Sequence, residues 1–172
     1  MIYIPVSEKE LELDKVQKSI ESLKKFGYDY EFVSSPEYIE KGIEHQRLIK
    51  ETRNKIFEIA IENGEKYICS QESSVVHLVD DNIEVMEKYL DDNEACGGVF
   101  VNPLKRNFPG NAPSRSVSLF IVRAELVKDF QFDLDNPQCE CQQLPNHIRE
   151  QGYTADWLEE EPGRILKLPR NK

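Results

Sequence analysis

The sequence has 172 residues, of which 39% are hydrophobic and 31% charged, and its formal net charge at neutral pH is −10. This length and composition predict a single folded domain over residues 1–172 and exclude a chain that is disordered throughout. The acidic charge, with no run of more than two basic residues, disfavours binding to nucleic-acid phosphates and to anionic lipid.

Strands and helices alternate in the first half of the predicted fold. Ile2 to Val6 is a short apolar run rich in β-forming residues, which predicts a buried strand. From Glu8 to Phe26 the apolar residues recur at spacings of two to four before Gly27, which predicts one amphipathic helix with a C-terminal glycine. The same criteria predict strand 28–33, helix 43–63, strand 66–69 and helix 83–90.

The alternation predicts a parallel sheet covered by helices, with a ligand site at the carboxyl ends of its strands. The second half adds strands at 96–101 and 117–122, a short helix at 145–151, and strands at 153–158 and 164–168. Residues 102–115 between two of these strands contain three prolines, and a loop of that length indicates a functional segment.

Two features of the sequence bear on the cellular compartment. No apolar stretch approaches the ~18 residues of a transmembrane helix, and the amino terminus lacks the basic flank of a signal peptide, so a soluble, cytoplasmic protein is expected. Cys69, Cys96, Cys139 and Cys141 do not form a disulfide framework or a zinc motif, and free thiols are expected. A redox pair of Cys139 and Cys141 is the alternative.

Four local patterns occur in a particular order along the chain. The first is the opening strand followed by an acidic turn at Glu8, and the second is a basic–amide pair in the helix before the third strand. The third is a polar cluster directly after that strand, and the fourth is a late series that ends in Gly-Tyr. The residues are Ile2–Val6; Arg53-Asn54; Gln71-Glu72-Ser73-Ser74; and Phe132-Asp133, Glu140-Cys141 and His147–Tyr153.

This order resembles the GT-A fold of nucleotide-sugar glycosyltransferases, in particular family 2 type enzymes, over roughly residues 2 to 160. The resemblance implies an α/β fold with a mixed, mainly parallel sheet covered by helices. It implies transfer of a sugar, with inversion, from a nucleotide-diphosphate sugar to a hydroxyl acceptor such as a glycan. The nucleotide-sugar-binding residues that it implies are Pro5, Arg53, Gln71, Glu72 and Ser74.

The family's Asp-x-Asp motif, which binds a divalent cation, falls on Glu72 and Ser74. Glu72 is therefore the candidate ligand for Mn²⁺ or Mg²⁺, because a hard cation takes carboxylate and phosphate oxygens together. The family's late metal-binding histidine has no counterpart after Glu159. Basic side chains are the alternative means of neutralising the diphosphate, and the candidates are Lys105, Arg106, Arg164 and Lys167.

The family's Glu-Asp pair falls on Glu140-Cys141, so that a cysteine replaces the usual catalytic aspartate. Glu140 is the candidate general base for the acceptor hydroxyl, and Asp133 and Asp135 are the reserves. The replacement also favours an alternative function, a GT-A-like module that binds a nucleotide, a glycan or a partner without catalysis. An unrelated α/β fold with another nucleotide ligand is the third hypothesis, and the hydrolase, P-loop and Rossmann signatures are absent from the sequence.

Overall fold

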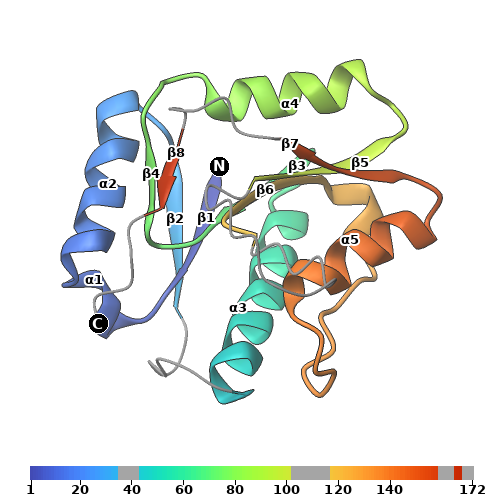
Figure 1. Ribbon diagram of the computed structural model, residues 1–172, viewed down its shortest axis with the longest axis horizontal. Coiled ribbons are helices and arrows are strands. Elements are labelled where there is room, and N and C mark those ends of the chain that lie inside the picture. The colour runs from blue at the N-terminus through green and yellow to red at the C-terminus, as the bar shows by residue number, and fades with distance from the viewer. Residues whose placement is uncertain (35–42, 102–116, 159–164, 168–172) are drawn as a thin grey trace, which may run out of the picture.

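The computed structural model describes residues 1–34, 43–101, 117–158 and 165–167. A six-stranded sheet has the order β2-β1-β3-β6-β5-β7 (Figure 1). Strands β1, β2 and β3 are parallel, β6 is antiparallel to β3 and to β5, and β7 is parallel to β5. The predicted mixed, mainly parallel sheet is confirmed. Its strands are β1 (Ile2–Val6), β2 (Tyr30–Ser34), β3 (Tyr67–Gln71), β5 (Cys96–Val101), β6 (Leu119–Arg123) and β7 (Thr154–Leu158).

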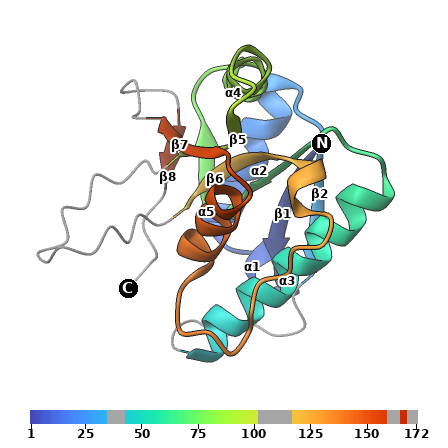
Figure 2. The same ribbon diagram turned by 90° about the vertical axis from the view of Figure 1, so that its right-hand side faces the viewer.

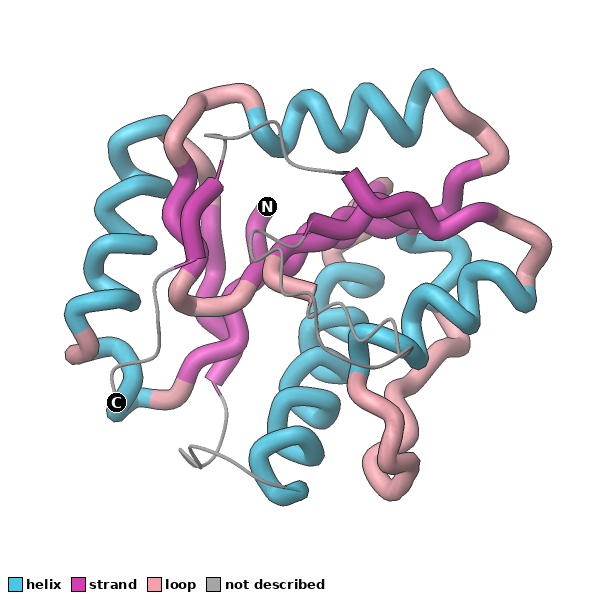
Figure 3. The backbone as a smooth tube through the Cα atoms, viewed as in Figure 1, coloured by secondary structure: helices cyan, strands magenta, loops and turns pink. Residues whose placement is uncertain are grey.

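Helices cover both faces of this sheet, with α3 and α5 on one side and α4 on the other (Figures 1 and 2). A separate antiparallel pair, β4 (Val75–His77) and β8 (Ile165–Lys167), lies beside α2 (Figure 3). No helix in the described part of the chain combines the length and apolarity that membrane crossing requires. The helices are α1 (Glu8–Leu11), α2 (Asp14–Phe26), α3 (Ile43–Glu62), α4 (Asn82–Asp92) and α5 (Glu140–Glu150), with a 3₁₀ turn η1 (Ala124–Val127).

The alternation of strand side chains separates two apolar layers. Tyr3 pairs with Ser70, which pairs with Phe120, and these three residues define what we call the α3 face of the sheet. The other side, the α2 face, carries Ile4 and Cys69 and packs against side chains of α2 and α4. Since both faces are covered, the strands read as nearly continuous apolar runs, as in other buried parallel sheets.

The single helix predicted from Glu8 to Phe26 is interrupted after Leu11, where the chain restarts as α2 at Asp14. Leu11 and Leu13 are two residues apart, and one continuous helix would direct them to nearly opposite sides. The break lets both leucines pack against the small cluster of Val6, Val16 and Ile20. Gly27 ends α2 at φ 71°, as predicted.

The last helix begins at Glu140, five residues before the predicted start at Pro145. Proline is typical of a first helical turn, which is why the sequence suggested that boundary. Here Pro145 lies inside α5 and is buried with Leu144 and Ile148. Glu140 is consequently the first residue of a helix, whereas the sequence placed it in a loop.

Helix α5 approaches β5 closely because Gly97 and Gly98 follow Cys96 at the start of that strand. A Cβ on Gly97 would lie 2.7 Å from Ile148 Cγ2, and one on Gly98 would lie 2.9 Å from Ile148 Cδ1. Both distances are shorter than a carbon–carbon contact allows. The glycine pair therefore sets how near the α5 backbone lies to the sheet.

The cysteines divide into two kinds. Cys69 and Cys96 are buried free thiols, as predicted. Cys139 and Cys141 form a disulfide, so the prediction of a free thiol was wrong for these two. Their separation of two residues, with a Cα–Cα distance of 5.2 Å, brings them within reach at the start of α5.

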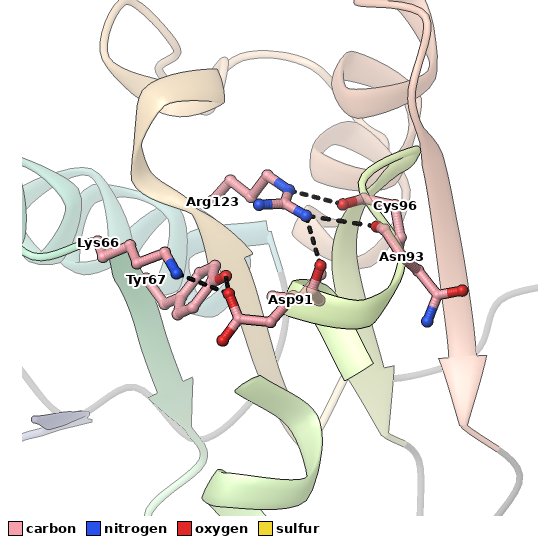
Figure 4. Close-up of polar contacts among 7 residues, drawn as sticks. Lys66, Tyr67, Asp91, Asn93, Cys96 and Arg123 are labelled. Atoms are coloured by element: carbon pink, nitrogen blue, oxygen red, sulfur yellow. Dashed lines mark hydrogen bonds and ion pairs between the residues drawn. The ribbon is translucent and has the colours of Figure 1, made fainter. Parts of the chain in front are cut away.

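Arg123 holds the end of α4 at the amino edge of the sheet (Figure 4). Its Nη2 donates to Leu90 O at 2.6 Å and to Asn93 O at 3.3 Å, and its Nε donates to Cys96 O at 2.8 Å. The guanidinium therefore supplies donors to carbonyls at the C-terminus of a helix, where a cation is also favoured by the helix dipole.

Replacing Arg123 by methionine is expected to lower the free energy of unfolding by about 2 kcal/mol, because three carbonyls lose a charged donor. Urea titration measures this change. Lys66→Met is the matched control, because Lys66 forms an exposed ion pair with Asp91 close to Arg123 (Figure 4). Such exposed pairs contribute less than about 1 kcal/mol. Equal losses in the two variants would contradict the assigned role of Arg123.

Candidate functional site

Residues that end the central strands meet at the carboxyl edge of the α3 face. Glu72 follows β3 directly, and its N–H donates to Ser118 O at 2.8 Å, which extends the pairing of β3 with β6 by one step. Ser118 N–H in turn donates to Val101 O at the end of β5. Pro5 lies two residues beyond Tyr3 on the same face of β1 and is half-buried. This edge is where open α/β sheets bind ligands.

Arg53 projects from α3 onto this part of the sheet. Its side chain is 2% exposed, and its guanidinium carbon lies 5.0 Å from the centroid of the Phe120 ring. Within the described residues no carboxylate forms an ion pair with it, and its Nε has no hydrogen-bond acceptor. A guanidinium stacked on an aromatic ring gains a favourable cation–π contact, but that contact does not satisfy the Nε–H donor.

Two serine hydroxyls on the same face are also without partners. Ser70 and Ser118 are both 0% exposed, and neither Oγ has a hydrogen bond. Ser70 pairs with Phe120, and Ser118 immediately precedes β6, two residues before Phe120, so the strand alternation directs both to the side on which Arg53 stacks. Arg53, Ser70 and Ser118 are called the Arg53 cluster below.

A buried polar group without a partner costs about 1–3 kcal/mol, and more when it is charged. Three such groups within one small region of a folded protein require an explanation. An anion bound beside the Arg53 cluster would accept hydrogen bonds from all three residues and compensate the buried positive charge. The cluster is therefore the candidate site for a phosphate-like ligand.

The remaining residues predicted to bind the nucleotide sugar lie in two different environments. Glu72 is half-buried at the carboxyl edge and opens a turn in which Val75 N–H donates to Glu72 O at 3.1 Å. Ser74 is buried within this turn, at 6% exposure. Gln71 is one residue earlier, so strand alternation directs its side chain to the α2 face, away from the Arg53 cluster.

Gln71 belongs to a buried hydrogen-bond network on the α2 face. Its Nε2 donates to Ser19 Oγ at 3.3 Å, and its Oε1 accepts from His77 Nε2 at 2.8 Å. Asn82 Nδ2 donates to the other ring nitrogen of His77 at 3.0 Å. The amide of Gln71 thus joins α2 to β4, and both its nitrogen and its oxygen are bonded within the protein, on the face opposite to the Arg53 cluster.

His77 is held neutral in this network. Burial lowers the pKa of His77 from 6.5 to about 4, because the ring is 2% exposed and charging it would require desolvation. The N–H of Asn82 points at His77 Nδ1, so protonation there would also place two donors face to face. Gln71 and Asn82 are close to His77 in sequence, but the link of Gln71 to Ser19 on α2 spans 52 residues and becomes visible only in the structure.

The stability of the protein is expected to fall as the pH decreases from 6.5 to about 4. In that window the unfolded chain binds a proton at His77 that the folded chain excludes, which costs about 3 kcal/mol once complete. Urea unfolding of the wild type and of His77→Gln at pH 7.5 and pH 4.5 measures the effect, and the carboxylates common to both proteins cancel in the comparison. The same pH dependence in both would contradict a neutral buried His77.

Helix α3 also positions the segment that leads into α5. Asn54 donates through Nδ2 to Phe132 O at 3.2 Å and accepts from Phe132 N–H at 2.7 Å. Lys50, 1% exposed, donates to Asp133 O at 3.0 Å and also to Asn136 O. The second residue of the Arg53-Asn54 pair is therefore a clamp on the backbone, a role that the sequence did not indicate.

The candidate bases lie along this clamped segment. Asp133 accepts from the N–H groups of Asp135 and Asn136, so its carboxylate is used in a local turn. Gln143 of α5 accepts from Asp133 N–H at 2.9 Å and donates to Asp133 O at 3.2 Å. Glu140 is half-buried at the first position of α5. These bonds fix the position of the start of α5 relative to α3. Helix α3 carries Arg53, and the start of α5 carries Glu140.

A divalent cation has few ligands here. No group of three or more His, Cys, Asp or Glu side chains suited to a metal ion occurs among the residues that the structure describes. Glu72 is the one carboxylate of the turn after β3, and a single carboxylate with a serine hydroxyl does not fit a protein-built cation site. Of the basic alternatives, Lys167 pairs in register with Val75, next to this turn, while Lys105, Arg106 and Arg164 lie outside the described residues.

Comparison with known proteins gives matches only at the level of structure. No protein-family model and no curated protein matches the sequence. Among solved structures, the chain is similar to mannosyltransferase PcManGT from Pyrobaculum calidifontis in complex with GDP-Man and Mn²⁺. The TM-score is 0.57 at 12% identity, over 90% of this chain and 52% of that one.

Two further structures give similar values. A glycosyltransferase involved in glycosylation of the major capsid of PBCV-1 matches with a TM-score of 0.58 at 11% identity, over 92% of this chain and 81% of that one. A D211N mutant of Drosophila β1,4-galactosyltransferase 7 in complex with manganese, UDP-Gal and xylobiose matches with a TM-score of 0.56 at 15% identity. That match covers 98% of this chain and 70% of the other.

These likenesses establish the fold. The chain has the GT-A-like fold that the sequence predicted, and the hypothesis of an unrelated α/β fold is excluded. It spans about half the length of the mannosyltransferase that it matches. Identities of 11–15% carry no residue roles across, so the chemistry has to be argued from this chain's own site.

Proposed function

Given a GT-A-like fold with a buried arginine, whose Nε has no hydrogen-bond acceptor, at the carboxyl edge of its sheet, we propose that this protein is a nucleotide-sugar glycosyltransferase. It binds a nucleotide-diphosphate sugar with its diphosphate beside the Arg53 cluster and transfers the sugar to a hydroxyl acceptor. The observation that carries the proposal is Arg53, 2% exposed with no acceptor for its Nε. In support, solved proteins of this fold contain GDP-Man, UDP-Gal and xylobiose.

In the proposed reaction the bond between the sugar and the diphosphate breaks, and negative charge develops on the leaving phosphate oxygen. The Arg53 guanidinium, with the hydroxyls of Ser70 and Ser118, donates to the phosphate oxygens and stabilises that charge. Because these donors are buried before the ligand arrives, they need little reorganisation in the transition state. Pro5, Glu72 and Ser74 form the rim of the proposed pocket.

Glu140 is the proposed general base. As the acceptor oxygen forms its bond to the sugar carbon, its proton passes to the Glu140 carboxylate, and the configuration at that carbon inverts. The clamp of Lys50 and Asn54 on the segment after Phe132 fixes the approach of α5 to α3. This clamp is proposed to set the distance between the base and the diphosphate.

The proposed mechanism has no step that requires a metal ion. Two of the solved proteins contain manganese, but the described residues of this chain do not fit a protein-built cation site. If Mn²⁺ or Mg²⁺ takes part, Glu72 would be its ligand and the ion would supply further positive charge to the diphosphate. The buried guanidinium already provides one such charge.

The alternative is a GT-A-like protein that binds a nucleotide or glycan without transferring sugar. The disulfide favours it, because Cys141, at the position of the family's catalytic aspartate, is 8% exposed and bonded to Cys139. Binding at the Arg53 cluster would be the same in both cases. Only the transfer step separates them.

Calorimetric titration with uridine and guanosine diphosphates, each with Mn²⁺ or with a chelator, tests the proposal. Saturable binding of at least one nucleotide is expected. Its dissociation constant in chelator should lie within about tenfold of the value with Mn²⁺, because each charged hydrogen bond from the Arg53 cluster contributes about 1.5–3 kcal/mol without the metal. Absence of binding under all conditions would contradict the proposed function. Release of nucleoside diphosphate from a bound nucleotide sugar in the presence of acceptors separates a transferase from a binding module.

A further inference from the structure

We infer that the Cys139–Cys141 disulfide is a reversible redox site, exchanged by thiol reductants and small disulfides, which controls the first turn of α5. The site itself is independent of the proposed function, and only its effect on Glu140 rests on that function. Glu140 is the single residue between the two bonded cysteines. A change of redox state therefore acts on the backbone that carries it.

The disulfide closes across the start of a helix. Cys139 is the N-cap residue of α5, and its carbonyl accepts the first-turn hydrogen bonds of Gln142 at 3.0 Å and Gln143 at 3.2 Å. Cys141 lies at the second helical position. The sulfur bridge thus joins the residue before the helix to the residue after Glu140, and it constrains the same turn that these hydrogen bonds form.

The two sulfurs differ in access. Cys139 is half-buried, whereas Cys141 is 8% exposed and packs in the apolar layer under α5. A thiolate reductant therefore attacks Cys139 Sγ, and Cys141 leaves as a thiolate. The helix dipole favours an anion in the first turn of α5, which favours Cys141 as the leaving group.

The exchange is balanced in electrons and protons. A dithiol attacks Cys139 Sγ, the S–S bond breaks, and the electron pair goes to Cys141, which takes up a proton from water. The second thiol of the reductant then displaces Cys139 from the mixed disulfide, so that the protein gains two thiols and the reductant becomes a disulfide. A small disulfide such as oxidised glutathione reverses both steps. In a reducing compartment such as the cytoplasm, disulfides are typically transient and redox-sensing.

The other two cysteines give an internal control. Cys69 and Cys96 are 2% and 1% exposed, and burial raises the pKa of both thiols. They lie on the α2 face of the sheet, among the side chains that pack against α2 and α4. Neither is expected to react while the protein is folded.

Reduction is expected to loosen the start of α5 without unfolding the helix. Gln143 still binds the backbone of Asp133 and Gln138, and Lys50 still holds Asp133 O. These bonds keep the segment in place, while the covalent restraint on Glu140 is lost. The consequence for the proposed transferase is a slower transfer step with unchanged nucleotide binding, because the Arg53 cluster is on other elements.

Alkylation of the native full-length protein tests the redox site directly. After treatment with dithiothreitol, iodoacetamide is expected to label Cys139, the more exposed thiol of the pair, but not Cys69 or Cys96, and reoxidation by oxidised glutathione before alkylation should remove the labelling. The wild-type far-UV circular dichroism should remain the same in both states. Labelling that needs denaturant, or a reduced protein that oxidised glutathione does not convert back, would overturn the inference.

A second measurement tests the effect on Glu140. Transfer in the oxidised protein is expected to be at least about tenfold faster than in the reduced protein, and Cys139→Ser should be slow and indifferent to dithiothreitol. Equal rates in both states of the wild type would overturn the control of Glu140. Failure of transfer in every state, with the alkylation pattern as expected, would instead contradict the proposed function and leave the redox site established.

Discussion

Replacing Arg53 by methionine is expected to weaken nucleoside diphosphate binding at least about 100-fold, since a buried guanidinium that donates to phosphate provides two or more charged hydrogen bonds. The same variant is expected to unfold at an equal or higher urea concentration than the wild type. Removal of a buried cation that has no ion pair within the described part of the chain relieves a desolvation cost, and apolar residues of similar volume at such positions are often neutral or stabilising. The opposite signs of the two effects make this variant informative.

Loss of the contact with Phe120 reduces the gain in stability expected for Arg53→Met. Arg53 lies 5.0 Å from that ring centroid, and methionine loses the cation–π part of this contact while keeping an apolar and sulfur–aromatic one. Lys55→Met is the matched control, because Lys55 is exposed on the same helix. Arg53→Lys keeps the charge and loses the planar fork, so its binding should fall between the wild type and methionine.

Calorimetry with the nucleotide and urea titration without it measure the two effects separately. A protein in which Arg53 serves only the core would show the reverse pattern, with lower stability in Arg53→Met and no change in nucleotide affinity. That outcome would contradict the assignment of the Arg53 cluster as an anion site. A large loss of affinity in Lys55→Met would show that general surface charge attracts the nucleotide.

Local patterns were sufficient to predict most of the fold. The apolar runs at 2–6 and 96–101 coincide with β1 and β5, and strand–helix alternation predicted the parallel part of the sheet. The errors occur where tertiary packing overrides the local pattern. Leu11 and Leu13 break a helix so that both reach one cluster, and Pro145 lies within α5, where it is buried with Leu144 and Ile148.

The candidate site was predictable only in part. Arg53 and Glu72 were identified from the resemblance, and the structure places both at the carboxyl edge. The same resemblance implied Gln71, although strand alternation directs its side chain to the opposite face from that of Glu72. Ser70 and Ser118 were missed, because an unpartnered hydroxyl becomes visible only when its surroundings in space are known.

Glu140→Gln is expected to reduce the rate of sugar transfer by about 100- to 10,000-fold, because a positioned general base contributes that factor. Glutamine has nearly the same shape and cannot accept the acceptor's proton as a carboxylate does. Nucleotide affinity should remain within about twofold, since the Arg53 cluster is untouched. The measurement is nucleoside diphosphate release with a nucleotide sugar and acceptor, beside a nucleotide titration of the same variant.

Stability is the necessary control for this variant, because Glu140 is also the first residue of α5. A carboxylate in the first turn interacts favourably with the helix dipole, so its neutralisation should lower the free energy of unfolding by about 0.3–1 kcal/mol and no more. Glu150→Gln, at the exposed far end of α5, should leave the transfer rate unchanged. If Glu140→Gln transfers sugar at the wild-type rate, the base is elsewhere, and the equivalent variants of Asp135 and Asp133 are the next to measure.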